Sequence, residues 1–316
     1  MANYCTESYD FGPDVGVMSL QQYSGWYFHQ QCLSINSQDT DNTGTRMHQG
    51  AHVLIRLLAK KAHLLCDRSS WIEIGAGSGI VTLAALSAMN YCTSKRPRVV
   101  ITDGNEKCLS LIAANYNSLY TSKALSLQES MDIKIMKLHW GNKHDANHSL
   151  AFNDHKPFDI IVGSELIYYR ADPVKLVETV TNLAGPNTIF IHAHIVRVAG
   201  MGTELARLLE RVGFNTYEYN IGDIVGDDEL TKNPGFHEVR TLISVPRSQE
   251  ENILKATLGI ELMNTGEECT IDSTTSYRCA LRRFIEDYTS NDGVTTAEGE
   301  VEKAENIFDI FMQHDE

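Results

Sequence analysis

Short apolar segments and amphipathic segments alternate through residues 71–245. This alternation predicts strands joined by helical crossovers, and a crossover places the next strand parallel to the one before it. No helix is expected between the last two apolar segments, 214–219 and 239–245, so these strands should pair antiparallel. The pattern predicts an α/β fold with a seven-stranded, doubly wound sheet. The sheet should be mostly parallel with an antiparallel final strand, and helices should cover both faces.

The boundaries of these elements follow from the apolar pattern. The expected strands are 71–74, 99–102, 133–138, 158–162, 188–195, 214–219 and 239–245. The expected helices are 50–62, 80–89, 109–116, 173–183 and 201–211, with a further helix at 276–288. Asp172 and Pro173 mark one helix start, because proline loses no hydrogen bond in the first turn of a helix.

Acidic residues are concentrated near the end of the chain. The net charge is −14, and residues 248–316 contain 16 acidic and 5 basic residues. This balance argues against a protein whose whole surface binds nucleic acid. We expect three parts: an irregular or hairpin segment at 1–49, the α/β domain at 50–247, and an acidic C-terminal extension at 248–316 that is partly helical or disordered.

The seven cysteines indicate a reducing compartment. Their number is odd and no pair has C-x-x-C spacing, so neither a disulfide framework nor a zinc site is expected. Residues 1–10 lack the basic and apolar pattern of a secretion signal, and no stretch approaches the ~20 apolar residues that span a bilayer. We expect a cytoplasmic protein, with the nucleus as an alternative, and no membrane partner.

A glycine-rich segment, Glu73-Ile-Gly75-Ala-Gly77-Ser-Gly79, leads from an expected strand into an expected helix. Glycines let a backbone approach a ligand closely, and a helix N-terminus offers unpaired N–H groups. The dinucleotide fingerprint GxGxxG requires a glycine where this chain has Ile80. The GxGxG form is typical of methyltransferases that bind S-adenosylmethionine, whose amino acid and ribose portions lie along the turn. A tight strand-to-helix turn without a ligand is the alternative.

Two further polar or aromatic positions follow expected strands. Asp103 ends the strand at 99–102 and could accept hydrogen bonds from both ribose hydroxyls, although an aspartate before a glycine is also a common turn residue. Trp140 follows the strand at 133–138, where an indole could stack on adenine or fill the core. Together with the glycine turn, these positions predict a nucleoside site at the carboxyl ends of the strands.

The segment Ser164-Glu165-Leu-Ile-Tyr168-Tyr169 runs out of the fourth expected strand. Its polar groups would stand over the methyl-donor site. Glu165 could engage a cationic acceptor or the amino group of the donor, and Tyr168 could line a channel for an amine. A partly buried acid paired with a nearby base is the alternative.

Metal binding is not expected. His192 and His194 share one face of a strand, and His144 and His148 lie four residues apart in an expected polar loop, without cysteine or clear carboxylate partners. S-adenosylmethionine is already activated as a sulfonium, so methyl transfer needs no metal.

In their order and spacing these motifs resemble the seven-strand (class I) S-adenosylmethionine-dependent non-histone protein-lysine methyltransferases, methyltransferase family 16. The resemblance covers about residues 50–247. It rests on the glycine segment, on Thr102-Asp-Gly-Asn-Glu-Lys107 with Asn115, on Trp140-Gly, and on the segment from Ser164 to Tyr169. The second motif is similar to the calmodulin-lysine branch, and the last is similar to the branch that acts on chaperones and elongation factors. The resemblance implies a Rossmann-like methyltransferase sheet and S-adenosyl-L-methionine as cofactor.

The resemblance also implies roles for single residues. Glu165 and Tyr168 fall on the family's Asp-x-x-Tyr motif, which is tied to positioning of the acceptor lysine, and they are the expected catalytic residues. The expected cofactor-binding residues are Glu73, Gly75, Ala76, Gly77, Asp103, Gly104, Asn105, Trp140 and Ser164. Two positions depart from the family pattern: glutamate replaces aspartate at 165, and His48 stands where many relatives have tryptophan.

The expected activity is N-methylation of a lysine on another, non-histone protein. Because lysine near its ordinary pKa of ~10.4 is mostly protonated, the site would have to favour the neutral amine before attack. A histidine, a protein N-terminus or a small-molecule amine are alternative acceptors. A third interpretation is a binding module with a decayed site, in which the acidic tail recruits a partner. The intact glycine turn and Asp103 argue against decay.

Overall fold

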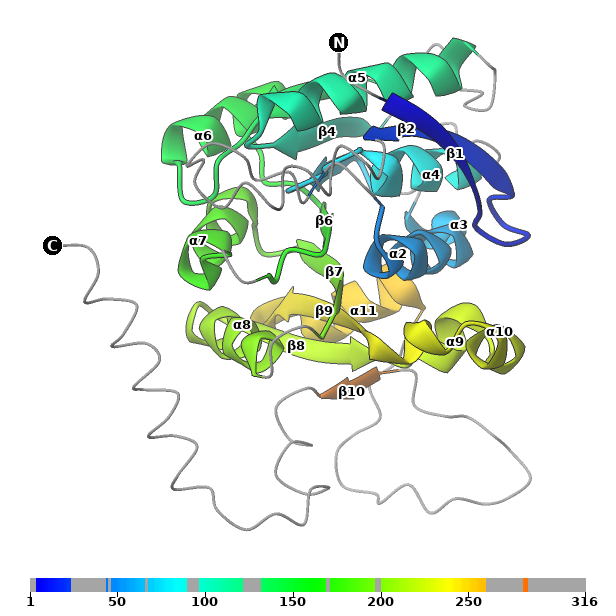
Figure 1. The fold of residues 1–316 in the computed structure, drawn as a ribbon. Helices are drawn as coiled ribbons and strands as arrows, with labels where there is room; N and C mark the ends of the chain where they lie inside the picture. Colours follow the sequence, from blue (N-terminus) through cyan, green and yellow to red (C-terminus); the bar gives the residue numbers. More distant parts are fainter. Residues whose placement is uncertain are drawn as a thin grey trace, which may run out of the picture. The chain divides into compact units, whose positions relative to one another are not determined.

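The central sheet has the strand order β10-β8-β9-β7-β6-β3-β4-β5 in the computed structural model (Figure 1). Its strands are β3 (Ser70–Glu73), β4 (Arg98–Asp103), β5 (Asp132–Lys137), β6 (Ile160–Ser164), β7 (Ile189–Ile195), β8 (Phe214–Tyr219), β9 (Val239–Pro246) and β10 (Leu281–Arg283). Strands β3 to β7 pair in parallel, whereas β9 pairs antiparallel with both β7 and β8. The predicted seven-stranded sheet with an antiparallel final strand is confirmed, and β10 adds an edge strand beside β8.

The structure describes residues 4–23, 44, 47–65, 68–89, 97–121, 132–168, 171–196, 200–259 and 281–283. All of them belong to one compact unit, Met1–Phe284, and the second unit, Ile285–Glu316, lies outside the described residues. The predicted helix at 276–288 is wrong at 281–283, where pairing with β8 makes a strand. The rest of that predicted helix lies outside the described residues.

Helices cover both faces of the sheet (Figure 1). Their buried side chains and those of the strands form two apolar cores. The first core involves α2 (Gln49–Lys60), α3 (Ala62–Leu65), α4 (Ile80–Met89), α5 (Glu106–Thr121), α9 (Ile221–Val225), α10 (Asp227–Lys232), η2 (Pro234–Glu238) and α11 (Glu250–Leu258). The second involves α6 (Lys143–Phe152), α7 (Pro173–Leu183) and α8 (Met201–Arg211). Val100 and Ile101 of β4 are fully buried in different cores, as expected for a strand that is covered on both faces.

Two expectations about loops were wrong. His144 and His148 lie in α6, whose N-terminus is capped by Asn142. The Asn142 side chain accepts hydrogen bonds from the N–H groups of His144 and Asp145 at 3.0 and 3.2 Å. The surface of α6 is largely polar, so an apolar pattern could not show it. Between β8 and β9, α9 and α10 are too short to produce a helical period.

Asp172 caps α7 as predicted. Its side chain accepts hydrogen bonds from the N–H groups of Val174 and Lys175 at 3.0 and 3.1 Å, and Pro173 is the first residue of the helix. This local signal was sufficient to place α7 because the cap and the proline act within one turn. None of the helices within the described ranges is long and apolar enough to cross a membrane.

A hairpin of β1 (Tyr4–Asp10) and β2 (Val17–Tyr23) precedes the sheet. The buried side chain of Asn115 on α5 ties it to the body of the protein. Its Oδ1 accepts the Gln21 N–H at 2.8 Å, and its Nδ2 donates to the backbone oxygens of Gln21 and Ser78 at 3.1 and 3.0 Å. Because Ser78 belongs to the glycine segment, Asn115 joins the hairpin to the turn after β3.

After β9, the short η3 (Arg247–Gln249) leads into α11, which packs against α3 and β9. Ile253, Leu254 and Leu258 of α11 are buried. The first residues of the expected extension therefore belong to the same compact unit as the sheet. The division into parts at 1–49, 50–247 and 248–316 stays a prediction.

Candidate active site

The parallel strands β3, β4, β5 and β6 end at the same edge of the sheet, and the predicted site residues all lie at this edge. Glu73 ends β3, Asp103 ends β4, and Ser164 ends β6. The glycine turn, Trp140 and Tyr168 lie in the segments that follow β3, β5 and β6. Open sheets of this class bind ligands at the carboxyl ends of their strands.

Three glycines shape the turn between β3 and α4. Gly75, Gly77 and Gly79 have φ angles of 60°, 56° and 76°, a left-handed region that other residues rarely adopt. A Cβ on Gly75 would lie 3.1 Å from Cζ2 of Trp140, and one on Gly77 would collide with the backbone oxygen of Gly44. Both the backbone conformation and the close neighbours therefore require glycine.

Ala76 and Asp103 tie this turn to β4. The N–H of Ala76 donates to the backbone oxygen of Thr102 at 2.9 Å. The Asp103 carboxylate accepts the N–H of Gly77 at 2.9 Å and the N–H of Asn105 at 2.8 Å. A carboxylate has about four acceptor positions, so these two bonds orient Asp103 without by themselves exhausting its capacity.

Asn105 and Gly104 complete the segment after β4. The side chain of Asn105 accepts the N–H of Lys107 at 2.9 Å at the start of α5. Gly104 lies against a ring, because a Cβ on it would be 3.1 Å from Cδ2 of His139. The predicted residues at 103–105 thus form a short ordered corner between β4 and α5.

Glu73 is buried at the base of the turn. Its Oε2 accepts the N–H of Thr82, in the first turn of α4, at 3.0 Å. Burial raises the pKa of Glu73 to about 7, and the hydrogen bond from the Thr82 N–H opposes this shift. Within the part of the chain that the structure describes, its Oε1 has no hydrogen-bond partner. A buried acceptor in this state is uncommon and marks a position where a polar ligand group could bind.

Trp140 and Tyr168 bring the ends of β5 and β6 together. Their ring centroids are 6.4 Å apart and the rings are tilted by 57°. The indole lies over the first glycine of the turn, Gly75. The next residue, Gly141, donates its N–H to Thr179 Oγ1 of α7 at 2.8 Å, which holds the end of this segment.

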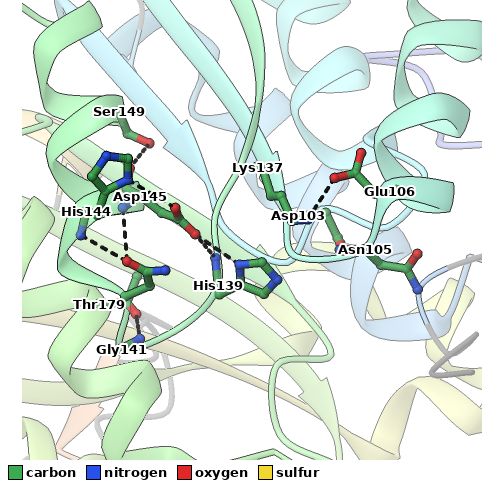
Figure 2. A network of polar contacts seen from close by, with 11 residues as sticks. Asp103, Asn105, Glu106, Lys137, His139, Gly141, His144, Asp145, Ser149 and Thr179 are labelled. Carbon is green, nitrogen blue, oxygen red and sulfur yellow. Dashed lines mark hydrogen bonds and ion pairs between the residues drawn. The ribbon is translucent and has the colours of Figure 1, made fainter. Parts of the chain in front are cut away.

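A polar network that sequence reasoning missed lies after β5 (Figure 2). The backbone N–H of His139 donates to Asp145 Oδ2 at 3.0 Å, and the ring Nδ1 of His139 lies 3.0 Å from the same oxygen. Although burial acts to raise it, hydrogen bonds from His139 hold the pKa of Asp145 below its usual value. Because the ring also contacts Gly104, His139 is fixed beside the corner that contains Asp103. His139 and Asp145 are six residues apart in the sequence. Because a loop was expected where α6 lies, this spacing did not indicate that the two side chains meet.

Glu165 follows β6 with a φ of 56°. This left-handed conformation costs a residue with a side chain roughly 1–2 kcal/mol, so its contacts must hold it there. Its N–H donates to the backbone oxygen of Ala193 at 2.7 Å. Its Oε1 accepts the N–H of Gly50 at 3.0 Å, and its Oε2 accepts the N–H of Ile195 at 3.4 Å. The predicted catalytic acid therefore joins the N-terminus of α2 to the end of β7, beside the half-buried Ser164.

Two positions before α2 also belong to this edge. A Cβ on Gly44 would lie 3.1 Å from Cys108 Sγ and 3.1 Å from Gly77 Cα. His48 is the N-cap of α2, and its side chain makes no capping hydrogen bond. Nothing in the local sequence connected Gly44 with the glycine turn, so only the fold reveals that the N-terminal segment contributes to the site.

The two histidines of β7 stack on each other. The rings of His192 and His194 have centroids 5.1 Å apart and planes 12° apart. His192 is fully buried, and burial, followed by the charge of His194, lowers its pKa well below the usual value. Among the described residues, no group of three or more His, Cys, Asp or Glu side chains is placed to hold a metal ion.

A cavity of about 970 Å³ shares no residue with the predicted site. It is lined by Asp10, Gly12, Pro13, Gly16, Val17, Arg56, Val225, Gly226, Asp227, Asp228 and Glu229. Arg56 pairs with Glu229 at 3.3 Å across its wall. We place the candidate active site at the carboxyl edge of the sheet, because the glycine turn and the aromatic pair meet there.

Residues 27–205, more than half of the chain, match a family described as lysine methyltransferase. The chain belongs to the lysine methyltransferase family. This membership confirms the resemblance inferred from the motifs, and the matched range includes every predicted site residue. S-adenosylmethionine as cofactor and transfer of a methyl group to nitrogen both agree with it.

Individual relatives are more distant. A protein-lysine N-methyltransferase, EFM3 from Chaetomium thermophilum, is 27% identical over 141 residues, which cover 45% of this chain and 38% of that protein. The chain thus matches well under half the length of this curated relative. A TehB-like SAM-dependent methyltransferase from Corynebacterium glutamicum has a TM-score of 0.40 at 10% identity, covering 71% of this chain and 96% of that one. The glycopeptide N-methyltransferase MtfA, solved with sinefungin, has a TM-score of 0.41 at 13% identity, covering 61% and 93%.

Proposed function

We propose that this member of the lysine methyltransferase family transfers a methyl group from S-adenosylmethionine to a lysine side chain of another, non-histone protein. The observation that carries the proposal is that the Trp140 indole lies against Gly75 and also pairs with the ring of Tyr168. Trp140 belongs to the expected donor half of the site and Tyr168 to the expected acceptor half. Their contact supports a single site at which both substrates would meet.

The residues at the carboxyl edge fit S-adenosylmethionine. Glycine at 75 and 77 leaves backbone rather than side chains along the turn, the Asp103 carboxylate can accept from ribose hydroxyls, and the Trp140 indole offers a face for adenine. Glu73 Oε1, which has no hydrogen-bond partner among the described residues, can accept from the amino group of the donor. When bound, S-adenosylmethionine supplies a sulfonium-activated methyl group.

Tyr168 is the residue that we assign to the acceptor lysine. An aromatic ring favours both the aliphatic stem and the cationic head of a lysine, so it can collect the acceptor in either protonation state. Attack requires the neutral amine, so the bound ammonium must first lose its proton. The proton leaves to water before transfer, and the rate then depends mainly on positioning and desolvation.

We also propose a class of partner and a cellular compartment for this protein. The partner is a protein that carries the target lysine, and the net charge of −14 argues against nucleic acid as the substrate. The odd number of cysteines, none of them in C-x-x-C spacing, supports a cytoplasmic location, with the nucleus as the alternative.

Labelling of a cell extract tests the proposal. The protein is incubated with isotope-labelled S-adenosylmethionine and extract, and labelled products are identified by mass spectrometry. We expect the methyl group on a protein lysine, with labelling lost when that lysine is changed to arginine. A methyl group on histidine or on a protein N-terminus, or labelling of small amines only, would refute the lysine assignment but not donor binding. Calorimetry with S-adenosylmethionine alone excludes a decayed binding module if it shows binding.

A further inference from the structure

We propose that Glu165 is a positioning residue that ties α2 to the carboxyl ends of β6 and β7, and that its carboxylate does not hold the acceptor amine. The inference deepens, and rests on, the proposed methyl transfer. It changes the role of the acid in the Glu-x-x-Tyr segment and leaves Tyr168 as the acceptor-side residue. It also assigns a function to Gly50, which sequence reasoning did not single out.

The contacts of Glu165 support this role. Both carboxylate oxygens accept backbone N–H groups, from Gly50 at 3.0 Å and from Ile195 at 3.4 Å. The Glu165 N–H adds a third bond, to the Ala193 oxygen at 2.7 Å. One residue therefore connects three elements that are distant in sequence. A carboxylate at the N-terminus of a helix is further favoured by the helix dipole.

Gly50 is shaped to receive this carboxylate. It is the second residue of α2, where glycine has no advantage in helix propensity. A Cβ at this position would collide with Glu165 Oε1 and would lie 3.1 Å from the Ala193 oxygen. The absence of a side chain on Gly50 therefore leaves the space that the Glu165 carboxylate occupies. An aspartate at 165 would withdraw the carboxylate by about one C–C bond, ~1.5 Å, and would open space above Gly50.

The contacts of Glu165 with Gly50, Ala193 and Ile195 form a clamp that also affects the donor side of the site. The chain that leads into α2 passes Gly44, which lies against Gly77 and near Asp103 Oδ2. Gly44 lies five residues before α2 begins, so a fixed N-terminus of α2 limits how far Gly44 can move from Gly77. In this way Glu165 aligns the acceptor side with the donor side without touching either substrate.

A double-mutant cycle tests the clamp. The variants are Glu165→Asp, Gly50→Ala and the two combined, with Glu251→Asp, an exposed acid on α11, as the control. Methyl transfer is measured as tritium incorporated from S-adenosylmethionine into heat-inactivated cell extract, and donor affinity by calorimetry. Because a hydrogen bond to a charged group is lost, each single variant should transfer methyl at least ~10-fold more slowly, with donor affinity within about threefold. The combined variant should be faster than the product of the two single effects, because the shorter acid leaves room for the alanine.

Thermal unfolding without any substrate completes the design. We expect each single variant to unfold at a lower temperature and the combined variant to recover part of the loss. If Gly50→Ala does not fold, recovery of folded protein in the combined variant still demonstrates the pairing. Independent effects that multiply, or full methyl transfer in folded Gly50→Ala, would overturn the inference. Absence of donor binding by the unmodified protein would instead refute the proposed function, and the unfolding cycle would remain a valid test of the contact.

Discussion

The donor side and the acceptor side of the site are built from different kinds of contact. On the donor side, contacts within turns hold the residues in place. Asp103 accepts from Asn105, two residues away, and the glycine turn bonds to the end of the neighbouring strand. On the acceptor side, Glu165 accepts from Gly50, 115 residues away in sequence. The donor residues therefore lie in local motifs that the sequence shows, whereas the acceptor side depends on how distant elements meet.

This difference separates the expected effects of substitutions. Changes at the glycine turn and at Asp103 should act on donor affinity. Changes at Tyr168 should act on turnover at nearly constant donor affinity. If variants of the two sides change the same quantity, whether donor affinity or turnover, this distinction between the sides is wrong.

The largest effect is expected from Gly77→Val. A valine would be strained at a φ of 56°, and its side chain would collide with the Gly44 backbone, so the turn that is assigned to the donor could not keep its shape. Calorimetry should detect no binding of S-adenosylmethionine. Gly213→Ala is the matched control, because Gly213 also has a positive φ, 97°, but an added Cβ would have no neighbour within 4 Å among the described residues. Donor binding by folded Gly77→Val would show that the turn is not the donor site.

Asp103→Ala should weaken donor binding by at least ~10-fold, since a hydrogen bond to a charged group contributes about 1.5–3 kcal/mol. The same change removes the acceptors for Gly77 and Asn105, so a modest loss of thermal stability should accompany it. Asp132→Ala, an exposed acid at the start of β5, should leave affinity unchanged. Unaltered donor affinity in folded Asp103→Ala would disprove its assignment to the ribose.

Tyr168→Ala should slow methyl transfer by roughly 10-fold, because a cation–π contact in a partly desolvated site contributes about 1–2 kcal/mol. Tyr168→Phe retains the ring and should slow it less, and donor affinity should stay within a few-fold in both. Tyr120→Ala, on the exposed surface of α5, is the control. A large loss of donor affinity would move Tyr168 to the donor side of the comparison.

Glu73 predicts a pH dependence of stability. Burial raises its pKa from 4.5 to about 7 in the folded chain, so the folded state binds this proton more tightly than the unfolded state. The stabilisation is full below about pH 4.5 and is lost as the pH rises to about 7. In Glu73→Gln this loss should disappear, so the unmodified protein should fall by several degrees relative to the variant between pH 5 and 8. Parallel melting curves across this range would contradict the shift.

The smallest effect on the site is expected from shortening the chain. Ending it at Gly259 should leave donor affinity within about twofold, because the donor motifs all precede α7. Ending it at Arg247 also removes α11 and its buried Ile253, Leu254 and Leu258, each worth about 1.5–3 kcal/mol, so this protein should melt earlier. Loss of donor binding in a folded protein that ends at Gly259 would show that the tail supports the site. Intact donor binding with slower methylation would make it a recruitment element.

Sequence reasoning succeeded where one element carries its own signal. The apolar runs of β3 to β9, the proline-marked start of α7 and the glycine turn were all recognised, and the family followed from their order. It failed at α6, which is polar on most of its surface, and at α9 and α10, which are too short to be periodic. His139 was missed because its partner Asp145 comes into reach only when α6 folds back.

The sequence alone determined the sheet, the family and the position of the donor turn, because periodicity, capping and backbone strain act over a few residues. Only the tertiary structure decided what Glu165 touches, where Gly44 lies and which side chain faces Trp140. These contacts join segments whose separation in sequence carries no information about their distance in space. A carboxylate can serve an amine or a helix N-terminus equally well. Which of these Glu165 binds depends on the approach of the Gly50 backbone, and a glycine in the sequence gives no indication of this contact.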